Sequence, residues 1–254
     1  MRFMIIRKAD HNTEAGTPPS AALLAAMEKY GAQLEAAGLS CAGQGLQPSA
    51  EGVRITFSDG KINLRAGPFP EEKQLVAGFI MMEAQSREEA IEWLRRWPAE
   101  DGDGELTLEI RGGGCPGGLE GIGLTKEAAN SASMDSGADQ AQRYMVMLKT
   151  NAQAEAGAIP SDAVLAAMAR RNEEGIRAGV LVAAEGLQTS ASGARVKFFS
   201  GKSTVLDGPF SETKELIAGY WLLQGKSIED AIAWVKSYPY PFIDDAEVEI
   251  RPVL

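Results

Sequence analysis

Residues 205–214 read VLDGPFSETK and residues 64–73 read LRAGPFPEEK, so one short motif occurs twice in this chain. Proline fixes its own φ angle and keeps the residue before it out of the helical region, so each Gly-Pro pair predicts a defined bend. The phenylalanine after it supplies an apolar anchor for that bend. Only the second copy carries an acid at the bend, because Asp207 corresponds to Ala66.

The similarity extends well beyond this motif, at an offset of 141 residues (207 − 66 = 141). Ser161 corresponds to Ser20, Gly179 to Gly38 and Trp234 to Trp93. Self-similarity of this length predicts an internal duplication. We therefore expect one unit over residues 1–111 and a second over residues 143–254.

Each unit alternates strand and helix patterns. In the first, apolar and alternating stretches predict strands over residues 3–7, 39–46, 53–57, 62–64, 75–83 and 106–110. Helices are predicted up to residue 37 and over residues 87–97, with Ser20 and Ser86 as N-caps and Gly38 as a C-terminal glycine. This order favours an α+β fold, an antiparallel sheet with its helices on one face. Because the strands are apolar on most positions, we expect the two sheets to pack together about a pseudo-twofold axis.

Residues 112–142 have no counterpart elsewhere in the chain and are rich in Gly, Ser and Ala. That composition is typical of a flexible linker that contributes little apolar surface.

A series of motifs in the second unit occurs in a fixed order: EGLQ at 185–188, Arg195, GK at 201–202, DGPFSETKE at 207–215 and AGY at 218–220. This series resembles the DGPF-domain branch of the YciI-like (YCII-related) family, in two tandem copies of which the first has a degenerate motif. The resemblance implies a ferredoxin-like fold that forms a dimeric α+β barrel. It implies little chemistry, although relatives often lie beside sigma-factor genes and a His-Asp pair is proposed to be catalytic in the YciI branch. The only histidine here, His11, lies in the loop after the first strand and departs from that pattern.

The charge balance of 25 basic and 35 acidic residues, net −10, argues against nucleic acid and anionic membranes as partners. The N-terminal apolar run is too short for a signal peptide, and no stretch approaches the length of a membrane span. Cys41 and Cys115 lack metal-ligand spacing and form no disulfide framework, which favours the cytoplasm. We predict no metal site and no cofactor, and an intramolecular pseudo-dimer that can associate further into a homo-oligomer.

The candidate site rests on a comparison between the two units. Asp207 is replaced by Ala66 and Glu185 by Gln44, so the first unit lacks two carboxylates that the second unit has. Paired carboxylates in a partly dry cleft can divide acid and base roles, so Asp207 and Glu185 are the predicted catalytic pair. The predicted ligand-binding residues around them are Arg195, Lys214, Glu212, Arg143, Tyr220 and Trp221. The alternative is structural: Asp207 caps a turn and Glu185 pairs with a basic residue.

Two functions remain open. The first is binding of a small molecule, with or without catalysis, at this acidic site in the second unit. The second is a non-catalytic regulatory or protein-interaction module, which the resemblance connects with sigma-factor pathways.

Overall fold

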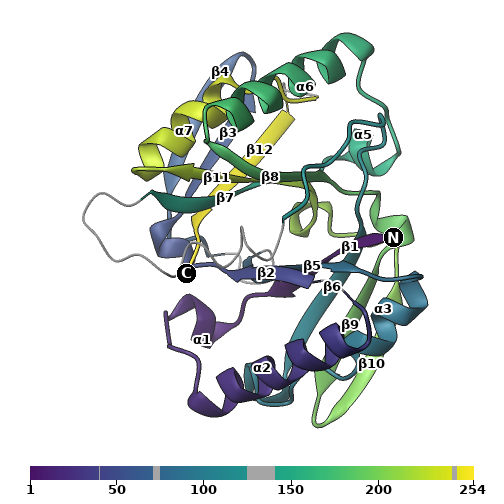
Figure 1. The fold of residues 1–254 in the computed structure, drawn as a ribbon. Helices are drawn as coiled ribbons and strands as arrows, with labels where there is room; N and C mark the ends of the chain where they lie inside the picture. The colour runs from purple at the N-terminus through teal and green to yellow at the C-terminus, as the bar shows by residue number, and fades with distance from the viewer. Residues whose placement is uncertain (40, 71–74, 125–140, 242–244) are drawn as a thin grey trace.

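The computed structural model describes residues 1–39, 41–70, 75–124, 141–241 and 245–254. Two β-sheets are stacked in the middle of the molecule (Figure 1). Helices α6 (Asp162–Arg177) and α7 (Ile228–Ser237) cover the outer face of one sheet, and α2 (Ala21–Ala36) and α3 (Arg87–Leu94) cover the outer face of the other. Each sheet contains six antiparallel strands among the described residues. The predicted α+β class is confirmed.

The first unit continues with these elements: β1 (Arg2–Lys8), α1 (His11–Glu14), β2 (Cys41–Gly45), η1 (Ser49–Glu51), β3 (Val53–Ser58), β4 (Lys61–Ala66), β5 (Val76–Glu83), η3 (Asp101–Gly104) and β6 (Leu106–Gly112). The second unit repeats the series: β7 (Gln142–Lys149), α5 (Ala152–Glu155), β8 (Leu181–Gly186), η4 (Ser190–Ser192), β9 (Ala194–Phe199), β10 (Lys202–Asp207), η5 (Thr213–Glu215), β11 (Ile217–Gly225) and β12 (Asp245–Pro252).

The ends of the helices follow from local chemistry. The Oγ atoms of Ser20, Ser86 and Ser161 each accept a hydrogen bond from the backbone N–H three residues later, as N-caps do. Gly38 and Gly179 follow α2 and α6 with φ values of 79° and 68°, the left-handed region that glycine adopts at little cost. The predicted caps are thus confirmed.

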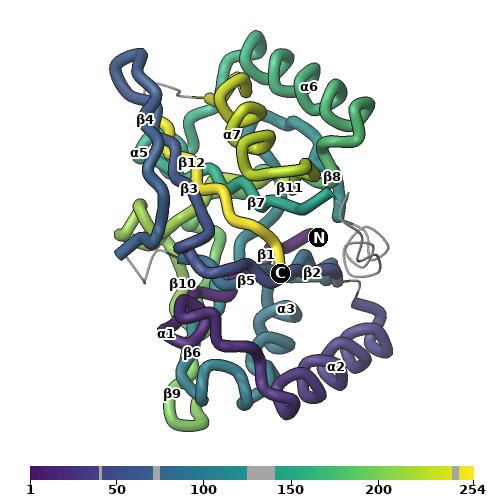
Figure 2. Tube along the Cα trace, turned by 90° about the vertical axis from the view of Figure 1, so that its left-hand side faces the viewer, coloured from purple at the N-terminus to yellow at the C-terminus, as the bar shows by residue number. Residues whose placement is uncertain are grey.

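The two units exchange their central hairpins. The strand order is β10-β9-β6-β1-β5-β2 in one sheet and β4-β3-β12-β7-β11-β8 in the other. Strand β9 pairs with β6 of the first unit, with Val196 opposite Leu108, and β3 pairs with β12 of the second unit, with Ile55 opposite Val248. Figure 2 shows each hairpin reaching into the lobe that the other unit forms. The sequence predicts one sheet from each unit's own strands, and the structure differs in this respect.

The repeated bends lie where each exchanged hairpin leaves its adopted sheet. Both Gly-Pro bonds, Gly67-Pro68 and Gly208-Pro209, are cis. A Cβ atom on Gly208 would lie 1.8 Å from the backbone oxygen of Ser190, so only glycine fits there. The ring of Phe210 lies under the guanidinium of Arg195, with 4.2 Å between the guanidinium carbon and the ring centroid. The predicted anchoring role of the phenylalanine therefore has a physical basis, a cation–π contact.

Three apolar layers hold the stack together. Two of them lie between a sheet and its own helices; in the second unit that layer includes Trp221 and Trp234. The third lies between the sheets, where Phe79 of β5 meets Tyr220 of β11 with ring centroids 5.4 Å apart. The two sheets therefore bury a shared apolar layer between them.

Residues 113–124 differ from the predicted flexible linker. The backbone N–H of Gly114 donates to Gly186 O at 2.8 Å, and that of Ile122 donates to Ala184 O at 2.7 Å, so the segment runs along the edge of β8. Leu124 is buried between the sheets, and Leu119 and Ile122 pack against the helix side of the second sheet. This covering segment (residues 113–124) is part of the packed structure, while the rest of the predicted linker up to residue 140 lies outside the described residues.

Candidate functional site

A cavity of about 100 Å³ lies in the second unit, between the outer face of its sheet, α6 and the covering segment. Its lining includes a floor of small residues on β8 and β11, namely Ala184, Gly186, Ala218 and Gly219. Small side chains at these positions leave the space that a larger residue would fill. Cys115 and Leu119 of the covering segment contribute to the wall facing the floor.

Aromatic and apolar side chains form the inner wall. The ring of Trp221 lies 4.6 Å from that of Tyr238, centroid to centroid, in an edge-on arrangement. Met168 of α6 and Leu148 of β7 also line the cavity. Walls of this kind favour apolar ligands, because the transfer of apolar surface from water to an apolar site is favourable.

One polar side chain in this wall has unused donor capacity. Asn172 of α6 is 7% exposed, and its Oδ1 atom accepts a 3.0 Å hydrogen bond from the hydroxyl of Tyr238. Burial raises the pKa of Tyr238 well above its usual range, so the hydroxyl keeps its proton and remains a donor. Among the described residues no acceptor is found for the Asn172 amide nitrogen. An amide NH₂ that lines a cavity in this way can donate to a ligand.

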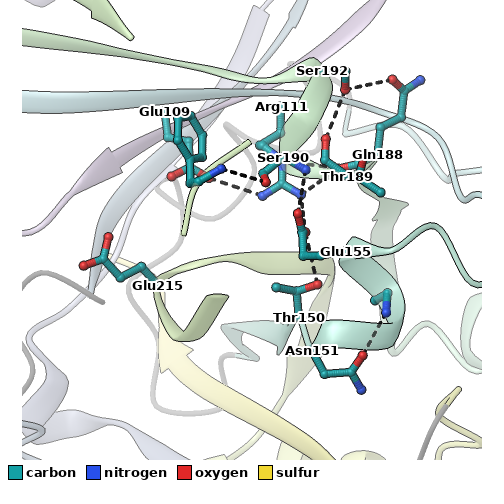
Figure 3. A network of polar contacts seen from close by, with 12 residues as sticks. Glu109, Arg111, Thr150, Asn151, Glu155, Gln188, Thr189, Ser190, Ser192 and Glu215 are labelled. Carbon is teal, nitrogen blue, oxygen red and sulfur yellow. Dashed lines mark hydrogen bonds and ion pairs between the residues drawn. The ribbon is translucent and has the colours of Figure 1, made fainter. Parts of the chain in front are cut away.

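A polar network surrounds Glu155 (Figure 3), which lines the cavity at its α5 end. The Glu155 carboxylate accepts from the backbone N–H of Ser190 at 2.9 Å and from the Thr150 hydroxyl at 3.2 Å, and it lies 3.4 Å from Arg111 Nη2. Arg111 also lies 3.3 Å from Glu109. The carboxylate at this end is thus neutralised and hydrogen-bonded.

The equivalent position in the first unit is filled. Leu148 corresponds to Arg7, whose Nη2 atom lies 2.5 Å from Asp101 Oδ1 and 2.7 Å from Asp10 Oδ2. The indole of Trp97, which corresponds to Tyr238, donates to Asp101 at 2.8 Å. A long cation and its carboxylates therefore occupy the place that stays open in the second unit.

Two buried ionic networks lie deeper in the fold, related by the duplication. In one, the fully buried Glu109 carboxylate lies 2.9 Å from Arg195 Nε, 3.3 Å from Arg111 Nη1 and 3.4 Å from Lys8 Nζ. The other places Arg54, Arg251 and Lys149 around Glu249 at 2.9, 3.1 and 3.6 Å. Burial alone would raise the pKa of Glu109, but the surrounding cations outweigh it and hold that pKa below its ordinary value.

The predicted acid Glu185 pairs with Arg2 of the first unit. Their side chains are in direct contact, and Glu185 is buried beneath the covering segment. A Cβ atom on Gly121 would lie 2.4 Å from Glu185 Oε1, so the segment closes tightly over the carboxylate. The hydrogen bond to Glu185 raises the pKa of Arg2, so the guanidinium stays charged. Tyr220 lies opposite Glu185 on β11; burial raises its pKa, and its hydroxyl has no hydrogen-bond partner among the described residues.

The predicted acid Asp207 lies in different surroundings. It ends β10, its side chain is 73% exposed, and it contacts Arg87 at the start of α3. Arg87 Nη2 also donates to the backbone oxygen of Gly193 at 3.0 Å. The structure therefore places Asp207 and Glu185 in separate ion pairs, each with an arginine of the first unit.

The remaining predicted ligand residues are dispersed. Arg195 belongs to the buried network around Glu109, and its Nη2 atom also lies 3.1 Å from Glu215. Lys214 and Glu212 are exposed, and the Ser211 hydroxyl donates to Glu212. Burial lowers the pKa of Arg143 on β7. Trp221, Tyr220 and Glu185 line the cavity, although the Tyr220 ring lies on the inter-sheet side.

The cavity residues Asn172, Leu148 and Cys115 were not foreseen as a site. A comparison of the two units could have indicated this site, since Arg7 of the first unit is replaced by Leu148 at the aligned strand position of the second.

Among the described residues, no group of three or more His, Cys, Asp or Glu side chains could hold a metal ion. No helix in the described part of the chain is long and apolar enough to cross a membrane.

Fold and cavity together define a duplicated α+β protein with two exchanged hairpins and a largely apolar cavity in its second unit. The family model for the YCII-related domain matches residues 1–105 and again residues 142–254, so the chain belongs to the YCII-related family as two tandem copies. It is also similar to an uncharacterized protein of Rhizobium meliloti (strain 1021), 28% identical over 78 residues. That match covers 31% of this chain and 63% of the relative, so the chain spans somewhat less than two thirds of the relative's length.

Proposed function

We propose that this chain is a small-molecule-binding member of the YCII-related family and that its ligand occupies the cavity of the second unit. The observation that carries the proposal is the contrast between the two units. Arg7, Asp101 and Trp97 fill the position in the first unit, whereas Leu148 and Tyr238, which replace Arg7 and Trp97, line the open cavity of the second. Core positions in proteins are normally close-packed, so an opening at one of two equivalent places favours a binding role.

Further proposals concern the finer family and fold assignment. The Asp207-Gly208-Pro209-Phe210 motif supports the DGPF branch, and the two stacked sheets with outer helices are compatible with a ferredoxin-like barrel. Proton transfer by Asp207 and Glu185 stays a hypothesis. Their separate ion pairs with Arg87 and Arg2 favour the structural alternative for both residues.

The test uses benzene as a probe, because an engineered apolar cavity of about 150 Å³ binds it. Binding is measured by saturation-transfer NMR, and its location by the rate at which a thiol reagent labels Cys115, which lines the cavity. The labelling is done in a Cys41→Ser background. We expect benzene to bind and to slow the labelling of Cys115.

A matched variant places the first unit's own residue in the cavity. The offset between the units is 140 residues in their last strands, where Arg251 corresponds to Arg111. Ala246 lines the cavity and corresponds to Leu106, so Ala246→Leu should abolish both effects of benzene. Asp207→Ala, which changes an exposed pair in the other sheet, should leave both effects intact. Benzene binding that survives Ala246→Leu but is lost in Asp207→Ala would place the ligand elsewhere and refute the proposal.

A further inference from the structure

We propose that the ligand of this cavity is a neutral ring-sized molecule with a hydrogen-bond acceptor, which the amide nitrogen of Asn172 recognises. The inference rests on the proposed binding function and specifies its ligand class. Three properties of the lining carry it: the size of the space, the state of the charges and the unused amide donor of Asn172 on the α6 side.

The size and shape come first. A space of about 100 Å³ is of the size that takes a single five- or six-membered ring. Trp221, Tyr238 and Met168 present aromatic and thioether surfaces to it. Such surfaces favour flat apolar rings, through stacked or edge contacts and through sulfur–aromatic contacts.

The charges come second. Glu155 is paired with Arg111 and Glu185 with Arg2, while Lys149 lies 3.6 Å from Glu249. These pairs leave the buried charges of the lining compensated from outside the cavity. A charged ligand in the buried part of the cavity would lose its hydration and find no counter-ion there, a cost of several kcal/mol for an unpaired ion. Glu120 also lines the cavity, but it is exposed. The buried part of the lining therefore selects against ions of either sign.

The polar contact comes third. The Oδ1 atom of Asn172 is already engaged by the Tyr238 hydroxyl, which leaves the NH₂ group as the free side of the amide. Asn172 is nine-tenths buried and lines the cavity, so this donor is available to a ligand there. A ligand acceptor such as a ring nitrogen or a carbonyl would satisfy it, whereas a ligand donor would not.

The first unit supports the assignment. The residue corresponding to Asn172 is Gly31, and a Cβ atom there would meet nothing within 4 Å. The polar pair of Asn172 and Tyr238 thus occurs only in the unit whose cavity is open. The presence of this pair in the second unit alone is consistent with ligand recognition, because the filled position of the first unit has no ligand to bind.

The experiment compares three rings of nearly the same size on the full chain: benzene with no polar atom, pyridine with an acceptor and pyrrole with a donor. At pH 8 pyridine is neutral. Dissociation constants come from NMR titration, and Cys115 labelling confirms the location. We expect Asn172→Leu to weaken pyridine about 5- to 10-fold, the effect of one lost neutral hydrogen bond, and to leave benzene unchanged or tighter. Asn172→Asp, which keeps an acceptor for the Tyr238 hydroxyl, should weaken pyridine at least as much.

The outcomes separate the two proposals. If benzene and pyridine both bind in the cavity and both variants affect them equally, the ligand class is wrong and the binding function stands. The class is equally overturned if pyrrole binds more tightly than pyridine and loses that advantage in Asn172→Leu. If none of the rings binds to the wild-type chain or slows Cys115 labelling, the proposed function itself fails.

Discussion

Replacing Glu109 with Gln should destabilise the protein strongly, because this carboxylate is fully buried among three cations. Gln keeps the shape and one acceptor oxygen but removes the charge that compensates Arg195 at 2.9 Å, Arg111 at 3.3 Å and Lys8 at 3.4 Å. Breaking a buried ion pair by changing one partner costs about 3–5 kcal/mol. Each cation retains a second acceptor, since Arg195 reaches Glu215, Arg111 reaches Gln188 O and Lys8 reaches Glu215 O. We therefore expect a loss near the lower end, about 3 kcal/mol.

The assay is urea unfolding at a series of pH values. Since the folded pKa of Glu109 is lowered from 4.5, its contribution to the free energy of unfolding is fully present above pH 4.5. It is lost as the pH falls through the folded pKa, so the gap between wild type and Glu109→Gln should stay constant from pH 7 to 5 and shrink below 4.5. Glu249→Gln in the equivalent network should behave alike, because the pKa of Glu249 is also lowered.

A matched control is Glu247→Gln, whose side chain is 38% exposed and lies 4.0 Å from Arg54. This change should cost less than about 1 kcal/mol, as exposed pairs do. A loss below about 1 kcal/mol for Glu109→Gln, or a gap that does not change between pH 7 and 3, would show that the network is not held by the ionised carboxylate.

Three further predictions concern the exchanged hairpins and the covering segment. A double-mutant cycle of Asp207→Ala and Arg87→Ala, followed by thermal unfolding, should give a coupling of about 0.2–1 kcal/mol that weakens in high salt, and zero coupling would leave the Asp207 pair without a stabilising role. Gly121→Ala should lower the melting temperature because its Cβ would meet the Glu185 carboxylate at 2.4 Å, whereas Gly31→Ala in α2 should raise it slightly; equal effects would contradict the packed covering segment. Residues 142–254 expressed alone should form a homodimer by hairpin exchange, and light scattering that shows a folded monomer would refute this.

The duplication, the capped helices and the α+β class could be predicted because they depend on local chemistry and on aligned residues. Ser20, Ser86 and Ser161 are caps in the structure as in the sequence. The exchange of hairpins could not be predicted in the same way. Strands β6 and β12 are equivalent in the two units, and Leu108 of β6 corresponds to Val248 of β12. The apolar pattern of β9 could therefore pair with the edge of either strand. Only the path of the chain in space decides between them.

The order of the covering segment was missed because its composition resembles that of a flexible coil. The glycines of this segment let neighbouring side chains approach the backbone closely, and they do not mark a flexible chain. A Cβ atom on Gly117 would lie 2.7 Å from Leu165, and one on Gly121 would lie 2.4 Å from Glu185. A few apolar residues between the glycines, Leu119, Ile122 and Leu124, supply the buried surface. Composition alone cannot separate these two uses of glycine.

Hairpin exchange changes how differences between the two units have to be interpreted. Asp207 and Arg87 come from different units, so the equivalent contact would join Ala66 to Ile228, and both charges are absent there together. Likewise Glu185 pairs with Arg2, while the corresponding residues are Gln44 and Arg143. The missing carboxylates of the first unit therefore do not by themselves indicate a degenerate catalytic pair. They coincide with two contacts between the units, Asp207 with Arg87 and Glu185 with Arg2, whose counterparts in the other half of the fold lack the acidic residue. The change from Arg7 to Leu148 is of another kind, because Arg7 pairs with Asp10 and Asp101 of its own unit. It alters the interior of one unit rather than an interface, and that is why the cavity, rather than the acidic motif, is the better candidate for a ligand site.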